Sequence, residues 1–165
     1  MAEMKFEESV ESGRHAAFKR MAGEWEGRML TWFEPTRPED DASINGNIKS
    51  LLDGRFVMHE YQSSFKGKSF SGMMIIGYSI GTDSFQCAWV DSFHTGTLLM
   101  FSESAGSDKL FSALGSYTAP GVPEPWGWRT EITMPDENNL IITAYNITPQ
   151  GEEAIATEIK YNRKR

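Results

Sequence analysis

Ten short segments of strand-like sequence, each followed by a turn signal, constrain the fold of this 165-residue chain more than any other feature. Apolar and polar residues alternate within many of the segments, which is typical of half-buried β-strands. Several of the turns are typical of tight hairpins, namely Asp53-Gly54, Lys66-Gly67, Gly81-Thr82 and "PQG" at 149–151. The predicted strands are Glu24–Phe33, Ser43–Leu51, Arg55–Phe65, Ser69–Tyr78, Asp83–Asp91, Gly96–Glu103, Asp108–Tyr117, Trp126–Met134, Asn139–Ile147 and Glu152–Asn162.

Consecutive strands joined by short hairpins form an up-and-down meander, and a long meander tends to close because closure removes its exposed edges. The sequence therefore predicts an all-β fold, a closed up-and-down antiparallel β-barrel of about ten strands over residues 24–163. One short amphipathic helix is predicted before it, at about 8–22. The Pro-rich loops at 34–42 and 118–125 are too short to divide the chain, so residues 1–165 are predicted to form a single domain.

The first and last strands carry residues suited to closing the barrel. Trp25 shares a face with Met29 in the first strand, and Arg163 shares a face with Tyr161 in the last. If these strands pair antiparallel, Trp25 and Arg163 meet. A guanidinium group over an indole ring contributes roughly 0.5–2 kcal/mol.

These residues carry a resemblance to a known superfamily. "GEW" at 23–25 after a short helix, with an Arg near the end of the last strand, resembles the closing signature of the calycins, which include the lipocalins. More closely, the ordered pieces "HAAFKRMAGEWEG", "LLDGRFV", "FSGMMIIGY", "WVDSFHTG" and "EIKYNR" resemble the bacterial family called domain of unknown function 1579. The resemblance implies a ten-stranded lipocalin-like barrel and implies no activity.

Composition excludes several classes of function. A net charge of −7 argues against nucleic acid or an anionic membrane as a partner, because both bind basic faces. Cys87 is the only cysteine, so neither an intramolecular disulfide nor a Cys-rich zinc site is possible. The N-terminal sequence lacks the features of a signal peptide, and no stretch is apolar enough to span a membrane, so a cytoplasmic location is expected.

The stretch "CAWVDSFHTG" at 87–96 holds the most distinctive polar pair. Trp89 and Asp91 share one face of the predicted strand, so Asp91 is expected to point inward near one end of the barrel. There it could accept backbone N–H groups of the following turn, or give a directional hydrogen bond to a ligand. It could also orient His94 for acid–base chemistry.

The leading functional hypothesis is binding of a small apolar or amphipathic molecule inside the barrel. Its predicted site has aromatic walls and two polar contacts, formed by Tyr61, Trp89, Trp128 and Tyr145 with Asp91 and His59. The first alternative is an isomerase or hydrolase of simple acid–base chemistry that uses Asp91 with a histidine. The second is a filled barrel that acts through its outer surface, for instance as a homodimer.

No metal or cofactor is predicted. The histidines His15, His59 and His94 lack the paired spacing of a zinc motif. "GEWEG" at 23–27 also resembles the haem-binding barrels called nitrobindins, which hold iron through a histidine late in the chain. Nothing after His94 is a histidine, so the resemblance fails at the iron ligand.

Overall fold

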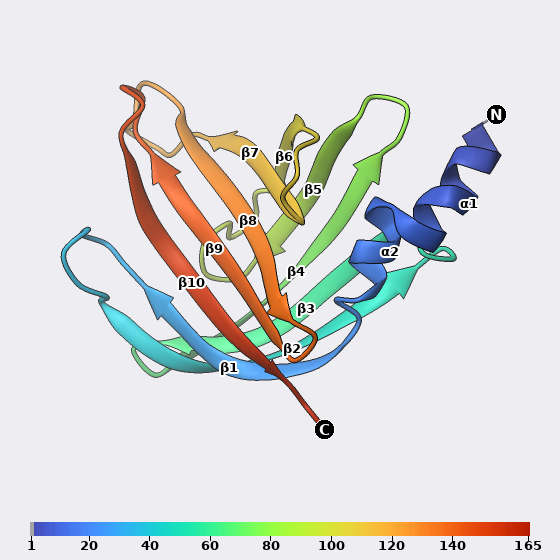
Figure 1. The fold of residues 1–165 in the computed structure, drawn as a ribbon. Helices are drawn as coiled ribbons and strands as arrows, with labels where there is room; N and C mark the ends of the chain where they lie inside the picture. The colour runs from blue at the N-terminus through green and yellow to red at the C-terminus, as the bar shows by residue number, and fades with distance from the viewer. Residues whose placement is uncertain (1) are drawn as a thin grey trace.

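The computed structural model describes residues 2–165 and contains a single closed sheet of ten strands. Each strand pairs antiparallel with its neighbours in the sequence, and the first pairs with the last (Figure 1). The strands are β1 Gly23–Thr31, β2 Asp40–Leu51, β3 Phe56–Phe65, β4 Lys68–Ser79, β5 Ser84–Asp91, β6 Met100–Ala105, β7 Phe111–Tyr117, β8 Trp126–Asp136, β9 Asn139–Ile147 and β10 Glu153–Arg163. The predicted closed, ten-stranded antiparallel barrel is confirmed.

The barrel closes where the sequence places its closing residues. Trp25 on β1 is the register partner of Arg163 on β10, and the Arg163 guanidinium lies 4.3 Å from the centre of the indole ring. Arg163 also donates to the carbonyls of Ala22 and Arg20, at 2.6 and 2.8 Å. The guanidinium therefore ties the segment before β1 to the last strand, in addition to stacking on Trp25.

Two helices, rather than one, precede the barrel: α1 Ala2–Ser12 and α2 Arg14–Lys19. The single helix expected at about 8–22 is broken at Gly13, the poorest helix former in this stretch. The break lets α2 bury His15 and Phe18 against one end of the barrel. The sequence did not predict that helix begins as early as Ala2, because the residues before Glu8 lack an apolar stripe. None of the helices within residues 2–165 combines the length and hydrophobicity needed to cross a lipid bilayer.

Strand β6 begins later than the expected Gly96. Residues between Asp91 and Leu98 form a turn, in which the Gly96 N–H donates to the Asp91 carbonyl at 3.0 Å. The Leu98 N–H donates to the Thr95 carbonyl at 2.9 Å. These local bonds take the backbone groups that a strand would have offered to β5, so strand pairing begins only at Met100.

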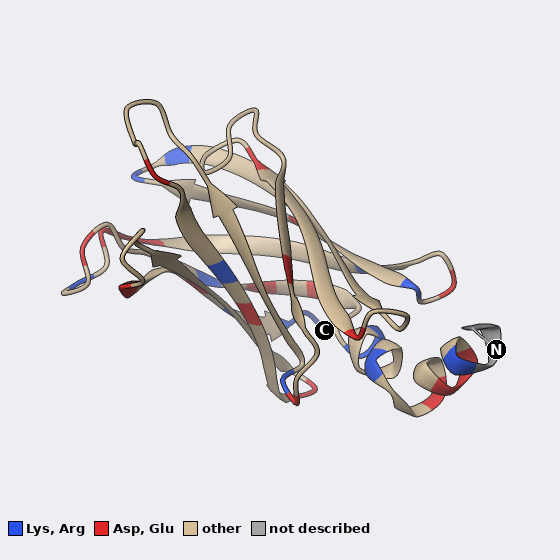
Figure 2. Ribbon diagram, turned by 90° about the horizontal axis from the view of Figure 1, so that it is seen from above, with Lys and Arg blue, Asp and Glu red and all other residues tan. Residues whose placement is uncertain are grey.

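Charged side chains lie away from the core, since Asp91 is the one buried Asp, Glu, Lys or Arg among the described residues. Four of the largest fully buried side chains come from the strands, namely Trp25, Tyr161, Phe85 and Phe111, and a fifth, Phe18, comes from α2. In Figure 2, Lys and Arg are interspersed with Asp and Glu along the strands and loops.

Candidate functional site

The two ends of the barrel differ in how well they are sealed. At the helix end, Trp25 and Phe85 have no accessible surface. Toward the opposite end, the inward-facing Tyr61, Trp89 and Trp128 remain 7%, 6% and 7% exposed. These three aromatic residues belong to the predicted site, and the structure brings them together inside the barrel. All three are buried, but less completely than the residues at the helix end, so we call the end away from the helices the open end.

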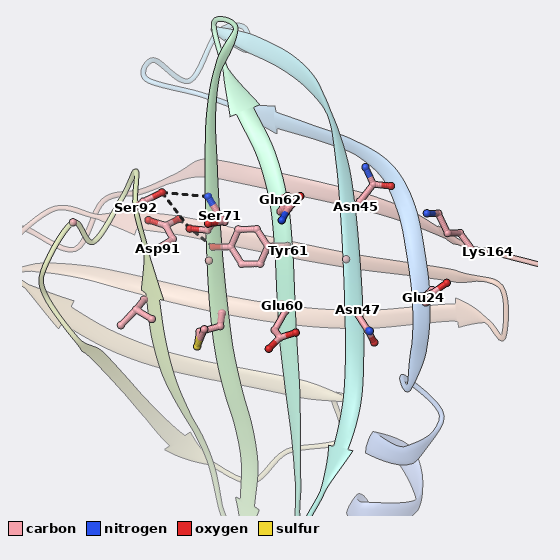
Figure 3. A pocket seen from close by; sticks show the side chains of 15 residues that line it. Glu24, Asn45, Asn47, Glu60, Tyr61, Gln62, Ser71, Asp91, Ser92 and Lys164 are labelled. Carbon is pink, nitrogen blue, oxygen red and sulfur yellow. Dashed lines mark hydrogen bonds between the residues drawn. The ribbon is translucent and has the colours of Figure 1, made fainter.

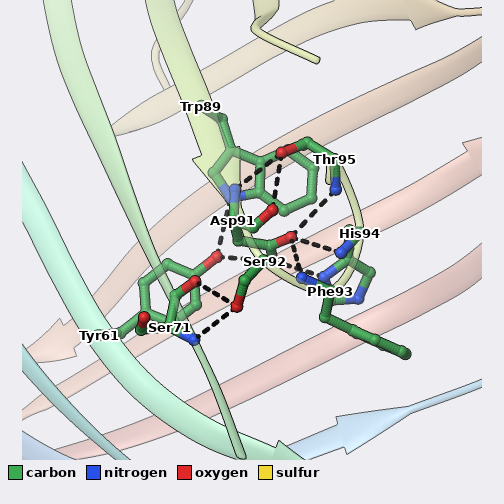
Figure 4. A network of polar contacts seen from close by, with 8 residues as sticks. All are labelled: Tyr61, Ser71, Trp89, Asp91, Ser92, Phe93, His94 and Thr95. Atoms are coloured by element: carbon green, nitrogen blue, oxygen red, sulfur yellow. Dashed lines mark hydrogen bonds and ion pairs between the residues drawn. The ribbon is translucent and has the colours of Figure 1, made fainter. Parts of the chain in front are cut away.

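Asp91 lies at the centre of a hydrogen-bond network at this open end (Figure 4). The Tyr61 hydroxyl donates to Asp91 Oδ2 at 3.0 Å, and the Trp89 indole N–H donates to the Tyr61 oxygen at 2.8 Å. His94 Nδ1 lies 2.6 Å from the same Oδ2 atom. Three residues of the predicted region are thus joined to one buried carboxylate, whose side chain has no exposed surface.

The other oxygen of Asp91 organises the turn that follows β5. Asp91 Oδ1 accepts the backbone N–H groups of Phe93 at 3.1 Å, of Thr95 at 3.0 Å, and of His94. The Thr95 hydroxyl donates to the Asp91 carbonyl at 3.0 Å. Asp91 therefore points inward, as expected, and serves as the backbone acceptor of its turn, which is one of the three roles considered from the sequence.

Burial and hydrogen bonding act in opposite directions on the Asp91 carboxyl. Burial raises its pKa, but the hydrogen bond and charge of His94 and the backbone N–H groups of Thr95 and His94 outweigh burial. The net pKa lies below the ordinary value, so the group is a carboxylate at neutral pH. Burial and the charge of Asp91 raise the pKa of Tyr61 well above its ordinary value, so Tyr61 remains a donor.

His94 presents the one unusual polar atom of the site. Its side chain is 16% exposed, and its Nε2 is buried without a hydrogen-bond partner among the described residues. Because the Asp91 carboxylate has no proton to give, His94 Nδ1 is the donor of this hydrogen bond, and Nε2 is the ring nitrogen left without a partner. The rings of Trp89, Phe70 and Trp128 surround the imidazole at 5.5, 5.8 and 6.0 Å.

Aromatic rings continue from His94 to the rim of the barrel. Phe93 lies edge-on to His94 at 4.5 Å and stacks on Phe65 at 4.9 Å. Phe65 in turn contacts Phe33, which is exposed, at 5.2 Å. Sequence reasoning missed this run, since its members come from three separate segments of the chain. The high phenylalanine content was the only signal.

His59 does not join the Asp91 network. Its ring is buried deeper in the barrel, where Nε2 lies 2.9 Å from the Tyr161 hydroxyl and the ring stacks on Tyr61 at 4.9 Å. Burial lowers the pKa of His59 to about 3, so the ring is neutral. It packs between two tyrosines, with the one polar contact taken by Tyr161.

This shift makes a prediction about stability and pH. A histidine that is neutral in the fold stabilises it fully above its unfolded pKa near 6.5, and that contribution is lost as the pH falls toward about 3. Between pH 7.5 and pH 5, the wild type should therefore lose about 2 kcal/mol of unfolding free energy through His59 alone. In urea unfolding, the free energy of unfolding of His59→Gln should fall by about 2 kcal/mol less than that of the wild type over this pH range. Parallel pH curves for the two proteins would contradict the prediction.

Tyr145, expected in the wall of the site, lies on the outer face of the barrel. Its register partner is Arg129, whose guanidinium stacks on the Tyr145 ring at 4.7 Å. The neighbouring partners Thr130 and Ala144 face inward and are buried, so alternation turns Tyr145 outward. It therefore cannot line the interior, which corrects the predicted set of residues.

A groove of about 600 Å³ lies on the outer face of the same strands (Figure 3). Most of its side chains are polar or charged, and the uncharged polar ones include Asn45, Asn47, Gln62, Ser71 and Ser92. Ser92, which stands between Asp91 and His94 in the sequence, bonds Ser71 on this outer side instead of joining them.

Comparison with known proteins identifies the family. The model of the family "Protein of unknown function (DUF1579)" matches residues 11–163. The chain belongs to the DUF1579 family. No curated protein is significantly similar to this DUF1579 chain in sequence.

Solved structures share the fold of this DUF1579 barrel. The crystal structure of Rv2717c from M. tuberculosis aligns with a TM-score of 0.62 at 14% identity, over 93% of this chain and 99% of that one. The S-type phycobiliprotein lyase CPES from Guillardia theta aligns with a TM-score of 0.53 at 9% identity, over 90% of both chains. At these identities the likeness establishes the barrel fold.

Gly72 is a residue of the DUF1579 site that sequence reasoning missed. It pairs with both Tyr61 and Asp91, on the strand between theirs. A Cβ atom there would meet the Tyr61 ring and lie 2.5 Å from the Asp91 Cβ. Only glycine lets these two side chains meet across β4. Within residues 2–165, no three His, Cys, Asp or Glu side chains form a group that could hold a metal.

Proposed function

We propose that this protein binds one small, flat and largely apolar molecule at the open end of its barrel. In this proposal, His94 Nε2 accepts a hydrogen bond from a hydroxyl or amine group of that molecule. The observation that carries the proposal is the buried Nε2 atom without a partner, because a buried polar atom left unpaired costs about 1–3 kcal/mol. Such atoms are rare in folded proteins unless a ligand or water completes them.

The surroundings of Nε2 favour an aromatic or conjugated ligand. Trp89 and Trp128 stack at 5.2 Å with their planes only 20° apart, which gives the site a flat wall. Both keep accessible surface, as does Tyr61. A mostly apolar wall with one directional polar group is the usual composition of a small-molecule site.

Asp91 has a positioning role in this proposal. It accepts a hydrogen bond from His94 Nδ1, so in this proposal Nε2 is the ring nitrogen that accepts from the ligand. The backbone N–H groups at Asp91 Oδ1 hold the turn, and with it the imidazole, in place. The expected ligand class is therefore apolar molecules with one O–H or N–H donor.

Mass spectrometry tests whether such a ligand accompanies the protein. We expect gently purified protein from its own source to show a mass excess under native conditions that disappears on denaturation. The excess would give the mass of the ligand. Equal native and denatured masses would exclude a ligand that stays bound through purification. Ligands that exchange would then be tested by titration.

Titration with two probes tests the role of His94. We expect 2-naphthol to quench the fluorescence of Trp89 and Trp128 and to bind about 10-fold more tightly than naphthalene, which lacks the hydroxyl donor. In His94→Phe this difference should disappear, while Tyr145→Phe, altered on the outer face, should keep it. Equal affinity of the wild type for both probes, or no binding of either, would refute the proposal.

One observation also favours the acid–base alternative. A histidine whose Nδ1 is held by a carboxylate and whose Nε2 is free has the arrangement of a general base. Ser92 does not supply a nucleophile, since its hydroxyl bonds Ser71 on the outer face. Nuclear magnetic resonance separates the two functions, because an enzyme converts the bound molecule and a binding protein returns it unchanged.

A further inference from the structure

An apolar patch covers the outer face of the barrel over β3 to β6, on the far side of the sheet from the core. Met58, Ile75, Ala88 and Phe101 are successive register partners and form one row across four strands. Met73 and Val90 begin the next row. We call these six residues the outer apolar face. Outward positions of an antiparallel sheet are normally polar, so this face is exceptional.

A groove of about 790 Å³ runs beside this row. Its lining combines the small residues Gly77, Ala88 and Gly127 with the large apolar side chains of Phe56, Ile75 and Phe101. Phe101 is the most prominent of them, since 67% of its surface is exposed. A projecting ring therefore lies next to a hollow with small residues in its lining.

We propose that the outer apolar face is the interface of a homodimer, in which Phe101 of each copy enters the groove of the other. A two-fold interface uses the same patch twice, so that patch must contain both the projection and the hollow. The outer apolar face and its groove meet this requirement within a single chain. The inference is independent of the proposed ligand site, which lies inside the barrel.

The size of the patch agrees with what a stable dimer needs. Six exposed apolar residues lie on or beside it, with exposures between 38% and 67%: Phe56, Met73, Ile75, Leu99, Phe101 and Leu114. At about 150–250 Å² for a large side chain, they present on the order of 500 Å² of apolar surface. A standard interface buries about 800 Å² per partner, of which rather more than half is apolar.

The charges around the patch favour a second copy over a membrane. The six residues of the outer apolar face are uncharged, and the one charged residue in their two rows over β3 to β6 is Glu60, the register partner of Met73. Two copies can therefore meet without burying an unpaired charge, because Glu60 has a partner of its own. The acidic residues at the rim already have partners, since Glu60 pairs with Lys49 and Glu103 with Gln86. A lipid surface with anionic headgroups would instead call for a basic rim.

Sedimentation velocity on the full chain tests the proposal. We expect the wild type to be dimeric by about 100 µM. We expect Phe101→Glu to raise the dimer dissociation constant at least about 100-fold, because the charge is introduced twice at the interface. Phe33→Glu is the matched control, since Phe33 is 65% exposed but lies at the open end of the barrel. It should leave the dimer intact. Circular dichroism establishes that each variant is folded, and Ile75→Lys replaces Phe101→Glu if that variant does not fold.

Every other outcome overturns the proposal. A wild type that remains monomeric has no such interface. A dimer that survives both Phe101→Glu and Ile75→Lys uses another surface, and so does one that Phe33→Glu dissociates. A monomer that co-sediments with phosphatidylcholine vesicles through Phe101 assigns the patch to a lipid surface instead.

Discussion

Gly27→Ala should lower the free energy of unfolding by at least about 3 kcal/mol, the range reached by forced steric clashes and overpacking. Gly27 is the register partner of Tyr161 in the pair of strands that closes the barrel. A Cβ atom at Gly27 would overlap the carbonyl oxygen of Lys160 and lie 2.8 Å from its carbonyl carbon. Both obstructing atoms are backbone, so β1 and β10 would have to separate. Urea denaturation at pH 7 measures the loss.

Gly81→Ala provides the control for this prediction. Gly81 lies in a turn, has no atom within 4 Å of its Cβ position, and does not adopt a positive φ. Its replacement should change the unfolding free energy by less than about 0.5 kcal/mol. If both variants were equally stable, the close approach of β1 and β10 at Gly27 would not be needed for closure.

Asp91→Asn should lower the free energy of unfolding by about 3 kcal/mol at pH 7, because it leaves buried donors unpaired around a buried amide. The two carboxylate oxygens together accept five donors, two from the side chains of Tyr61 and His94 and three from backbone N–H groups. An asparagine keeps one oxygen and turns an NH₂ group toward the remaining donors. Whichever way the amide lies, one side of the network loses its acceptor.

At acid pH, the difference in unfolding free energy between Asp91→Asn and the wild type should become smaller. The pKa of Asp91 is lowered in the fold, so its ionisation stabilises the protein above the unfolded pKa near 3.9, and this contribution is lost as the pH falls further. The variant has no such group to lose. Urea unfolding at pH 7 and near pH 3 measures the change, and Asp108→Asn, at an exposed position, serves as the control. A constant difference at both pH values would contradict the assigned role of Asp91.

Much of the fold could be predicted because its signals are local. Alternation within β5 and β8 correctly turns Trp89, Asp91 and Trp128 inward, since period two is built into the extended backbone. The hairpin signals correctly separate the ten strands. Trp25 and Arg163 could be paired because antiparallel closure places the start of β1 beside the end of β10.

Where both faces of a strand are similarly apolar, alternation has no preferred phase. In β3 the face of Val57, His59 and Tyr61 is no more apolar than that of Phe56, Met58 and Glu60, yet the first is buried. Tyr145 was misplaced for a related reason, because Ile141 and Ile142 make both faces of β9 apolar. Pairing with Trp128, Thr130 and Ile132 on β8 decides which face of β9 is inside.

The sequence by itself determined that this chain forms a meander, that the meander closes, and that Asp91 ends a strand next to a tight turn. Only the tertiary structure decided which atoms meet Asp91. Tyr61 lies 30 residues away and reaches Asp91 across β4, where Gly72 leaves room for the contact. The free Nε2 of His94 likewise depends on rings from β4, β5 and β8 that converge on the turn after β5. Such contacts depend on register and closure, and no local pattern of residues encodes them.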